Sequence, residues 1–215
     1  MQSLASRSLY LCVGMRADME TFLAAVLRGG VDVVQLREKQ ADDQDRRAMA
    51  LRMVPLCHDF GVPFIMNDSP ELAADVGADG VHVGQDDASV ARCRELLGDE
   101  AIVGLSTHEP AEFAEGLLAP VSYLSAGPIV PTPTKLGRPG TGVDYALTSQ
   151  AQTALPVFVT GGVNEATVGE LVTRGLRHFV VVRALTEAVD PETTARRLRQ
   201  AIDTARSAMA IEPPQ

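Results

Sequence analysis

The stretch that decides the fold reads Phe64-Ile-Met-Asn-Asp-Ser69, then residues 70–79, then Gly80-Val-His-Val-Gly-Gln-Asp-Asp87. It contains two short apolar runs, and each run ends abruptly in polar and acidic residues. Between them, residues 70–76 have a helical pattern that Gly77 can end. A strand, a helix and a second strand in this order predict two parallel strands.

Two carboxylates follow these two strands. Because parallel neighbours have their C-terminal ends at one edge, we expect Asp68 and Asp87 to lie close together. Carboxylate pairs commonly hold Mg²⁺, with phosphate and water oxygens completing its octahedron. The alternative is that these residues cap the helices that follow, since aspartate is a good N-cap.

The composition is that of an ordinary globular chain of 215 residues, 46% hydrophobic and 22% charged, with few aromatic residues. A net charge of −9 argues against a general nucleic-acid or membrane-surface binder, which needs a basic face. Cys12, Cys57 and Cys93 lack metal-type spacing and are expected to be buried thiols. With no signal-peptide core and no membrane-length apolar run, we expect a cytoplasmic protein.

The strand-then-helix pattern recurs along the whole chain. Strand-like runs lie at residues 9–13, 31–36, 64–66, 81–83, 101–105, 121–126, 156–160 and 178–182, and helical segments include 18–28, 70–76, 89–97, 110–118, 143–150, 164–174 and 191–209. The strands are continuously aliphatic, which indicates burial on both faces. Eight units without a linker predict one α/β domain over residues 1–215, a (β/α)₈ TIM barrel with frayed ends at 1–7 and 210–215. A doubly wound sheet is the alternative, but no Gly-x-Gly-x-x-Gly follows the first strand.

Polar residues gather where the predicted strands end, which is where such barrels build their active sites. These ends read Gln35-Leu-Arg-Glu-Lys39, Asn67-Asp68, Gln85-Asp86-Asp87, Ser106-Thr-His108, Thr132-Pro-Thr-Lys135 and Gly161-Gly162. Scattered surface charge would not fall so consistently at one end of the strands. The convergence therefore indicates an enzyme.

The residue types at this rim suit phosphorylated ligands. Arg37, Lys39 and Lys135 can bind phosphate oxygens, although each alone could be a solvated surface charge. Gly161-Gly162 can bring backbone N–H groups to an anion at a helix N-terminus, or can simply form a tight turn. Together with a metal, this set predicts two phosphorylated ligands and diphosphate as a leaving group.

The histidines and Ser106 carry weaker signals. His82 lies inside a strand and is expected to be buried and hydrogen-bonded, while His108 could support the site or shuttle a proton. Ser106 has no convincing Ser-His-Asp partner set, so a hydrolytic nucleophile is not expected. The Pro- and Gly-rich segment 127–142 is too long for an ordinary connection, which favours a functional loop.

Taken together, these motifs resemble the thiamine-phosphate synthase family over about residues 35–191. The likeness depends on Gln35-Leu-Arg-Glu-Lys39, Asn67-Asp68, the 80–87 stretch, Gly104-Leu-Ser106, residues 127–135 and Thr160-Gly-Gly162. It implies a TIM barrel and a Mg²⁺-dependent transferase of thiamine biosynthesis. That reaction moves the hydroxymethylpyrimidine group from its diphosphate to the thiazole phosphate nitrogen and releases diphosphate.

The resemblance also implies roles for individual residues. It assigns the pyrimidine diphosphate to Gln35, Arg37, Lys39, Asn67, Ser106 and Lys135, with Arg37, Lys39, Ser106 and Lys135 catalytic and Leu36 and Glu38 as further contacts. It assigns the thiazole phosphate to Thr132, Pro133, Thr134, Gly162 and the backbone of Val182 and Arg183, and Mg²⁺ to Asp68 and Asp87.

One position departs from the family pattern. Many relatives end the eighth strand with serine where this chain has Arg183, which can keep a backbone contact and add a cation, or can block the pocket with its side chain. Two rival functions stay open: a thiazole tautomerase, which has no use for the diphosphate set, and a non-catalytic sensor of phosphorylated ligands. A homo-oligomer is possible, since every barrel helix has an apolar face.

Overall fold

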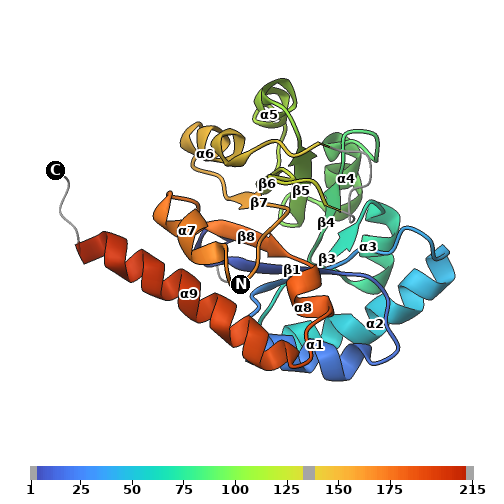
Figure 1. Ribbon diagram of the computed structural model, residues 1–215. Coiled ribbons are helices and arrows are strands. Elements are labelled where there is room, and N and C mark those ends of the chain that lie inside the picture. The colour runs from blue at the N-terminus through green and yellow to red at the C-terminus, as the bar shows by residue number, and fades with distance from the viewer. Residues whose placement is uncertain (1–3, 133–138, 212–215) are drawn as a thin grey trace.

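The computed structural model describes residues 4–132 and 139–211, in which eight parallel strands close into a barrel in the order β1 to β8 (Figure 1). The strands are β1 (Leu9–Val13), β2 (Val33–Leu36), β3 (Phe64–Asn67), β4 (Gly80–Val83), β5 (Ile102–Thr107), β6 (Tyr123–Ala126), β7 (Val157–Val159) and β8 (His178–Val181). β1 pairs with β8 through Leu9 and Phe179, which closes the ring. The predicted TIM barrel is confirmed, and the open sheet is excluded.

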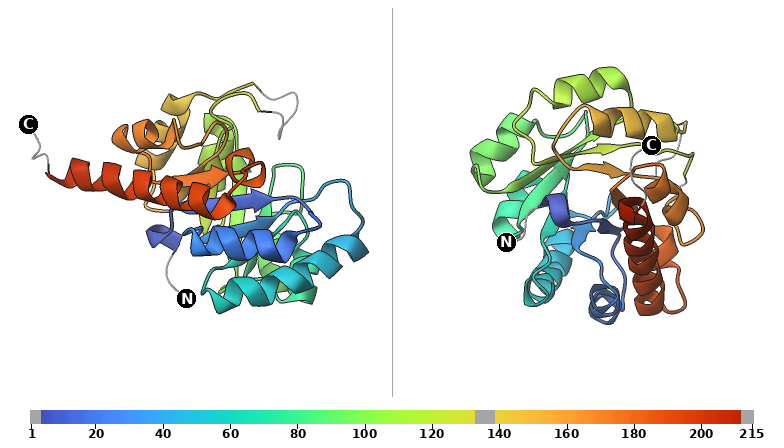
Figure 2. Two further views of the ribbon diagram at one scale, coloured as in Figure 1. Left: turned by 60° about the horizontal axis from the view of Figure 1, so that its bottom comes forward. Right: turned by 90° about the vertical axis from the view of Figure 1, so that its left-hand side faces the viewer.

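Helices surround the strands in each view (Figure 2). They are the 3-10 helix η1 (Leu4–Ser6) and the α-helices α1 (Met19–Arg28), α2 (Asp43–Asp59), α3 (Pro70–Val76), α4 (Val90–Leu97), α5 (Pro110–Gly116), α6 (Val143–Ala151), α7 (Val168–Thr173), α8 (Arg183–Thr186) and α9 (Pro191–Ile211). α9 packs against both α1 and α7, so the last helix covers the seam where the barrel closes. Across residues 4–132 and 139–211, each helix is too short or too polar to cross a bilayer.

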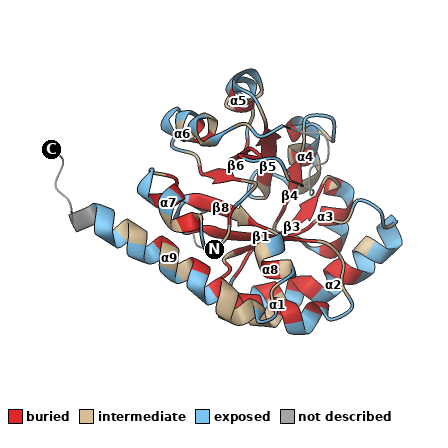
Figure 3. Ribbon diagram, in the orientation of Figure 1, coloured by how far each residue is buried: buried red, intermediate tan, exposed pale blue. Residues whose placement is uncertain are grey.

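Two cores hold the barrel together. The outer core fills the space between strands and helices, and the helices accordingly carry buried residues along part of their length and exposed residues along the rest (Figure 3). The inner core lies inside the barrel and consists of Tyr10, Val33, Ile65, Tyr123 and Phe158. The rings of Tyr10 and Tyr123 each meet Phe158 edge to face with centroids 5.2 Å apart. This aromatic plug closes the lower barrel beneath the polar rim.

Burial of the three thiols agrees with the sequence. Cys12, Cys57 and Cys93 are all buried, as expected, and none of them forms a disulfide with another. Burial raises the pKa of the Cys57 thiol to about 12, which keeps it protonated at neutral pH. Cys57 and Cys93 therefore belong to the packing of the outer core.

The structure differs from the sequence expectations just before α7 and just after β8. Residues 164–167 are not helical, because the Asn164 side chain accepts the N–H groups of Ala166 and Thr167 and forms a turn before α7. The one-turn helix α8 directly after β8 was not predicted at all. At the N-terminal side of the barrel, η1 precedes β1, and the Arg7 side chain is buried and donates to the Asp32 carbonyl oxygen at 2.6 Å.

Candidate active site

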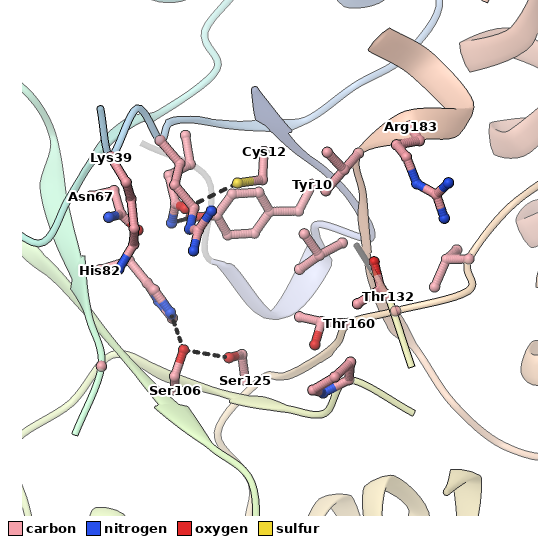
Figure 4. Close-up of a pocket in the computed structure, with 18 of the residues that line it drawn as sticks. Tyr10, Cys12, Lys39, Asn67, His82, Ser106, Ser125, Thr132, Thr160 and Arg183 are labelled. Atoms are coloured by element: carbon pink, nitrogen blue, oxygen red, sulfur yellow. Dashed lines mark hydrogen bonds between the residues drawn. The ribbon is translucent and has the colours of Figure 1, made fainter. Parts of the chain in front are cut away.

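A pocket of about 930 Å³ opens at the C-terminal ends of the strands. It brings together most of the residues singled out by the sequence: Gln35, Arg37, Glu38, Lys39, Asn67, Asp68, Asp87, Ser106, Thr132, Gly162, Val182 and Arg183. Figure 4 shows Lys39 and Asn67 on one side of the pocket, with Arg183 on the other side. Segments far apart in the chain thus meet at one rim because every strand runs in the same direction.

Some expected contacts lie elsewhere. The Leu36 side chain is fully buried in the outer core and does not line the pocket, because alternate residues of a strand face opposite sides. Glu38 lines the pocket, but its carboxylate accepts the N–H groups of Met15 and Gln40 and so organises the two neighbouring loops. Pro133, Thr134 and Lys135 lie outside the described residues.

Serine residues, and not the two aspartates, cap the helices that follow β3 and β4. The Ser69 hydroxyl accepts the Leu72 N–H at the start of α3, and the Ser89 hydroxyl accepts the Arg92 N–H at the start of α4. Asp68 is therefore not needed as a cap. Its φ of 65° lies in the left-handed region, which non-glycine residues enter at a cost of about 1 kcal/mol.

The two carboxylates meet as the strand order predicts. The Asp68 and Asp87 side chains lie within hydrogen-bonding reach of each other, Lys39 Nζ is 3.1 Å from Asp68 Oδ2, and Asp87 Oδ2 accepts the Gly84 N–H at 2.7 Å. Burial and the neighbouring Asp87 raise the pKa of Asp68. Burial opposes ionisation of Asp87, but its hydrogen bonds with Asp68 and the Gly84 N–H lower its pKa. Such a pair binds a shared proton or a cation.

These donors fit Mg²⁺ in one specific way. The described residues contain no cluster of three or more His, Cys, Asp or Glu side chains that could enclose a metal. Mg²⁺ does not need one, because it is usually held by one or two carboxylates and keeps water and substrate phosphate as its other ligands. Asp68 and Asp87 therefore suit a metal that arrives with a polyphosphate.

A second anion cradle lies across the pocket at the ends of β7 and β8. Gly161 and Gly162 have φ of 85° and 74°, and a Cβ on Gly162 would lie 2.6 Å from Val130 Cγ2. Glycine is required there both for the backbone conformation and for space. Thr160 Oγ1 is buried beside them without a hydrogen-bond partner among the described residues. The N-terminal residues of α8, including Arg183, line the same part of the pocket.

The base of the pocket is crossed by a chain of buried hydrogen bonds. Gln35 Nε2 donates to the Tyr10 hydroxyl at 2.9 Å, and that hydroxyl lies 2.9 Å from the Tyr123 hydroxyl. The Tyr123 hydroxyl lies 2.9 Å from His82 Nδ1, and His82 Nε2 lies 2.8 Å from Ser106 Oγ. Burial raises the pKa of both tyrosines, which are therefore neutral phenols.

Comparison with known proteins identifies the family. A family model described as thiamine monophosphate synthase matches residues 9–185. The chain belongs to this family. It is 42% identical over 175 residues to a thiamine-phosphate synthase of Thermus thermophilus, covering 81% of this chain and 84% of the relative. It is 40% identical over 198 residues to the enzyme of Acidothermus cellulolyticus, covering 90% and 93%.

Other relatives differ in length or share mainly the fold. The chain is 36% identical over 200 residues to a Synechocystis thiamine-phosphate synthase, but covers only 58% of it, and covers 52% of a Nostoc punctiforme relative. A Pyrococcus furiosus structure named thiamine phosphate pyrophosphorylase superposes with a TM-score of 0.83 at 24% identity, covering 92% of this chain and 96% of that one. The barrel of the thiamine monophosphate synthase family is thus shared across distant sequences.

Several residues that line the pocket in this family member were missed by sequence reasoning: Tyr10, Cys12, Tyr123 and Ser125. A signal for them exists. Gln35 and Ser106 face the barrel interior, and the strand register pairs Cys12 with Gln35 and Ser106 with Ser125. Alternate residues of a strand face the same side, so counting back by two from Cys12 reaches Tyr10, and counting back by two from Ser125 reaches Tyr123. The same count would have excluded Leu36.

The two pocket histidines have distinct environments. His82 is buried and hydrogen-bonded, as expected, but its partner on Nδ1 is the Tyr123 phenol and not a carboxylate. Ser106 and His82 therefore do not form the triad of a hydrolase. His108 contacts Glu112 Oε2 through Nδ1 at 2.9 Å, and its backbone N–H donates to the same oxygen, so it secures the start of α5.

Proposed function

We propose that this chain makes thiamine phosphate by transferring the 4-amino-2-methylpyrimidine-5-methyl group from its diphosphate to 4-methyl-5-(2-phosphoethyl)thiazole. The observation that carries this proposal is the placement of two different anion sites in one pocket. Asp68, Asp87 and Lys39 form a site that suits a metal-bound polyphosphate, and Gly161-Gly162 with Arg183 form a cradle that suits a single phosphate.

The chemistry follows from this division. The bond between the pyrimidine methylene carbon and the diphosphate oxygen breaks, and both bonding electrons leave with the diphosphate. The thiazole nitrogen then donates its lone pair to the methylene carbon, and the new C–N bond completes the balance. Arg37 and Lys39 line the polyphosphate side of the pocket and stabilise the negative charge that develops on the leaving group. No proton has to be removed, so no general base is required.

The metal belongs to the polyphosphate side. Asp68 and Asp87 would hold Mg²⁺, which when bound neutralises charge on the diphosphate and makes it a better leaving group. Lys39 stays close to Asp68 and supplies a second positive charge at the same place. The phosphate cradle across the pocket fixes the other substrate, so that its nitrogen is aligned with the methylene carbon.

The deciding experiment mixes the purified chain with both substrates and Mg²⁺ and measures thiamine phosphate and diphosphate together. We expect both products in equal amounts, and no products after removal of Mg²⁺ with a chelator. Isomerised thiazole without diphosphate release would favour the tautomerase, which the Arg37, Lys39, Asp68 and Asp87 set argues against. Tight ligand binding without turnover would favour a sensor. A cytoplasmic location and a homo-oligomer stay predictions.

Arg183 provides a prediction that is specific to this chain. Its side chain lines the pocket at the start of α8, beside the glycine pair. Arg183→Ser should raise the KM for the thiazole phosphate about tenfold and leave the KM for the pyrimidine diphosphate unchanged, because a charged hydrogen bond contributes about 1.5–3 kcal/mol. Steady-state kinetics with each substrate varied in turn measure this.

A matched control uses the other end of the same strand. Arg177 is exposed just before β8, on the rim away from the pocket, so Arg177→Ser makes the same chemical change without touching the site. It should leave both KM values unchanged. A faster Arg183→Ser enzyme would show instead that Arg183 obstructs the thiazole phosphate.

A further inference from the structure

The buried hydrogen-bond chain has a direction that is set at one end. The Gln35 side-chain amide is engaged on both sides, since Nε2 donates to the Tyr10 hydroxyl at 2.9 Å and Oε1 accepts from Cys12 Sγ at 3.2 Å. With this orientation, the Tyr10 oxygen is an acceptor toward Gln35. An amide has distinct donor and acceptor ends, so its orientation can determine the direction of every bond beyond it.

The direction propagates through two phenols to the histidine. Having accepted from Gln35, Tyr10 can donate its own proton to the Tyr123 oxygen at 2.9 Å, and Tyr123 can then donate to His82 Nδ1 at 2.9 Å. A neutral imidazole that accepts at Nδ1 carries its proton on Nε2. A neutral His82 in this tautomer would donate from Nε2 to Ser106 Oγ, at a distance of 2.8 Å.

The last step decides what Ser106 can offer a ligand. Its oxygen accepts from His82 Nε2 and from the Ser125 hydroxyl at 3.3 Å, which engages both acceptor positions of that oxygen. The hydroxyl proton of Ser106 is then left to point into the pocket, which Ser106 lines. Figure 4 shows these contacts among His82, Ser106 and Ser125.

We propose that Tyr10, Tyr123 and His82 are positioning residues that make Ser106 a hydrogen-bond donor, so that the pocket selects a ring with an acceptor at this point. The ligand part rests on the proposed function: the unprotonated ring nitrogen of an aminopyrimidine is such an acceptor. A pyrimidinone analogue that presents a ring N–H there would meet the Ser106 proton and be rejected, because one buried donor would lose its partner.

Gly104 provides independent support for the close contact between Tyr123 and His82. It lies in β5 between Tyr123 and His82 in the strand register, and its φ is not in the left-handed region. A Cβ at this position would lie 2.1 Å from Tyr123 Cζ and 2.5 Å from His82 Nδ1. Glycine is therefore present here to make room for the phenol–imidazole pair, whose rings stack with centroids 5.4 Å apart.

The first test reads the proton on His82 directly. In ¹⁵N NMR spectra of the 215-residue protein, with the His82 signals assigned by comparison with His82→Gln, we expect an unprotonated Nδ1 and a protonated Nε2. Gln35→Glu replaces the amide donor by a carboxylate acceptor. Each hydrogen bond from residue 35 to His82 should then reverse its direction, which places a proton on His82 Nδ1. A protonated Nδ1 in the unaltered protein would overturn the proposal.

A double variant shows whether the tyrosines transmit the effect. Tyr123→Phe removes the hydroxyl that joins Tyr10 to His82 and keeps the ring in the aromatic plug. In the Tyr123→Phe background, Gln35→Glu should no longer change the protonation of His82 Nδ1. If Gln35→Glu changed the protonation of His82 equally with and without the Tyr123 hydroxyl, the effect would be direct electrostatics and not a relay through the tyrosines. That result would refute the proposal.

The second test measures specificity. His82→Phe keeps a flat ring beside Tyr123 but removes the Nε2 donor, which lets the Ser106 hydroxyl rotate toward Ser125. The KM for the pyrimidine diphosphate should rise about tenfold, with an unchanged KM for the thiazole phosphate, and His82→Gln should recover part of the loss. Equal KM values in all three proteins would contradict the inference. If the unaltered chain forms no thiamine phosphate, the proposed function fails while the NMR results still decide the relay.

Discussion

Under the proposed function, Asp87→Asn is expected to lower the rate of thiamine phosphate formation in the presence of Mg²⁺ by on the order of 10²- to 10³-fold, the loss seen when a main electrostatic group is removed from an active site. Asparagine keeps the shape and can still accept the Gly84 N–H that Asp87 Oδ2 accepts at 2.7 Å, so the loop should stay in place. What is lost is the negative charge that, in the proposed function, would hold Mg²⁺ together with Asp68. Initial rates measured over a range of Mg²⁺ concentrations should show a higher metal requirement.

Two controls make this result specific. Asp99 is an exposed aspartate that precedes β5, at the rim opposite the pocket, and Asp99→Asn changes the net charge equally. It should leave the rate unchanged. Binding of the thiazole phosphate to Asp87→Asn, measured by calorimetry, should also be unchanged, because the cradle lies across the pocket. Full activity in Asp87→Asn would remove Asp87 from the metal site.

Gly104→Ala is expected to destabilise the fold by about 1–3 kcal/mol, the usual cost of overpacking a core. The new Cβ would lie 2.1 Å from Tyr123 Cζ, and Tyr123 is only 1% exposed and wedged against Tyr10 and Phe158. The ring cannot move aside without breaking its hydrogen bonds or the aromatic plug. Urea or thermal unfolding measures the change in the free energy of unfolding.

Gly169→Ala is the matched control for that experiment. Gly169 lies in the helix α7 and has nothing within 4 Å of where a Cβ would stand. Its substitution should be neutral or stabilising by about 0.5–1 kcal/mol, because alanine loses less backbone entropy in a helix than glycine does. Equal stability of Gly104→Ala and the unaltered protein would show that the space around Tyr123 and His82 is larger than the structure indicates.

Much of the site was predictable because of its topology. Asp68 and Asp87 each follow an apolar strand, and a parallel barrel brings such positions to one rim whatever their separation in the chain. The choice between a cap and a ligand was not predictable from these residues alone. The structure shows that Ser69 and Ser89 provide the caps, and the metal-ligand role of the two aspartates stays a proposal.

The sequence by itself determined the closed barrel and the rim at which its chemistry lies, because strand direction follows from the order of apolar runs and helices. Only the tertiary structure decided which inward-facing side chains touch. Tyr10 and Tyr123 are 113 positions apart, yet their hydroxyls lie 2.9 Å from each other across the barrel interior. Contacts across a closed barrel depend on the stagger of its strands and on how the aromatic rings inside it pack, and neither can be predicted from local sequence patterns.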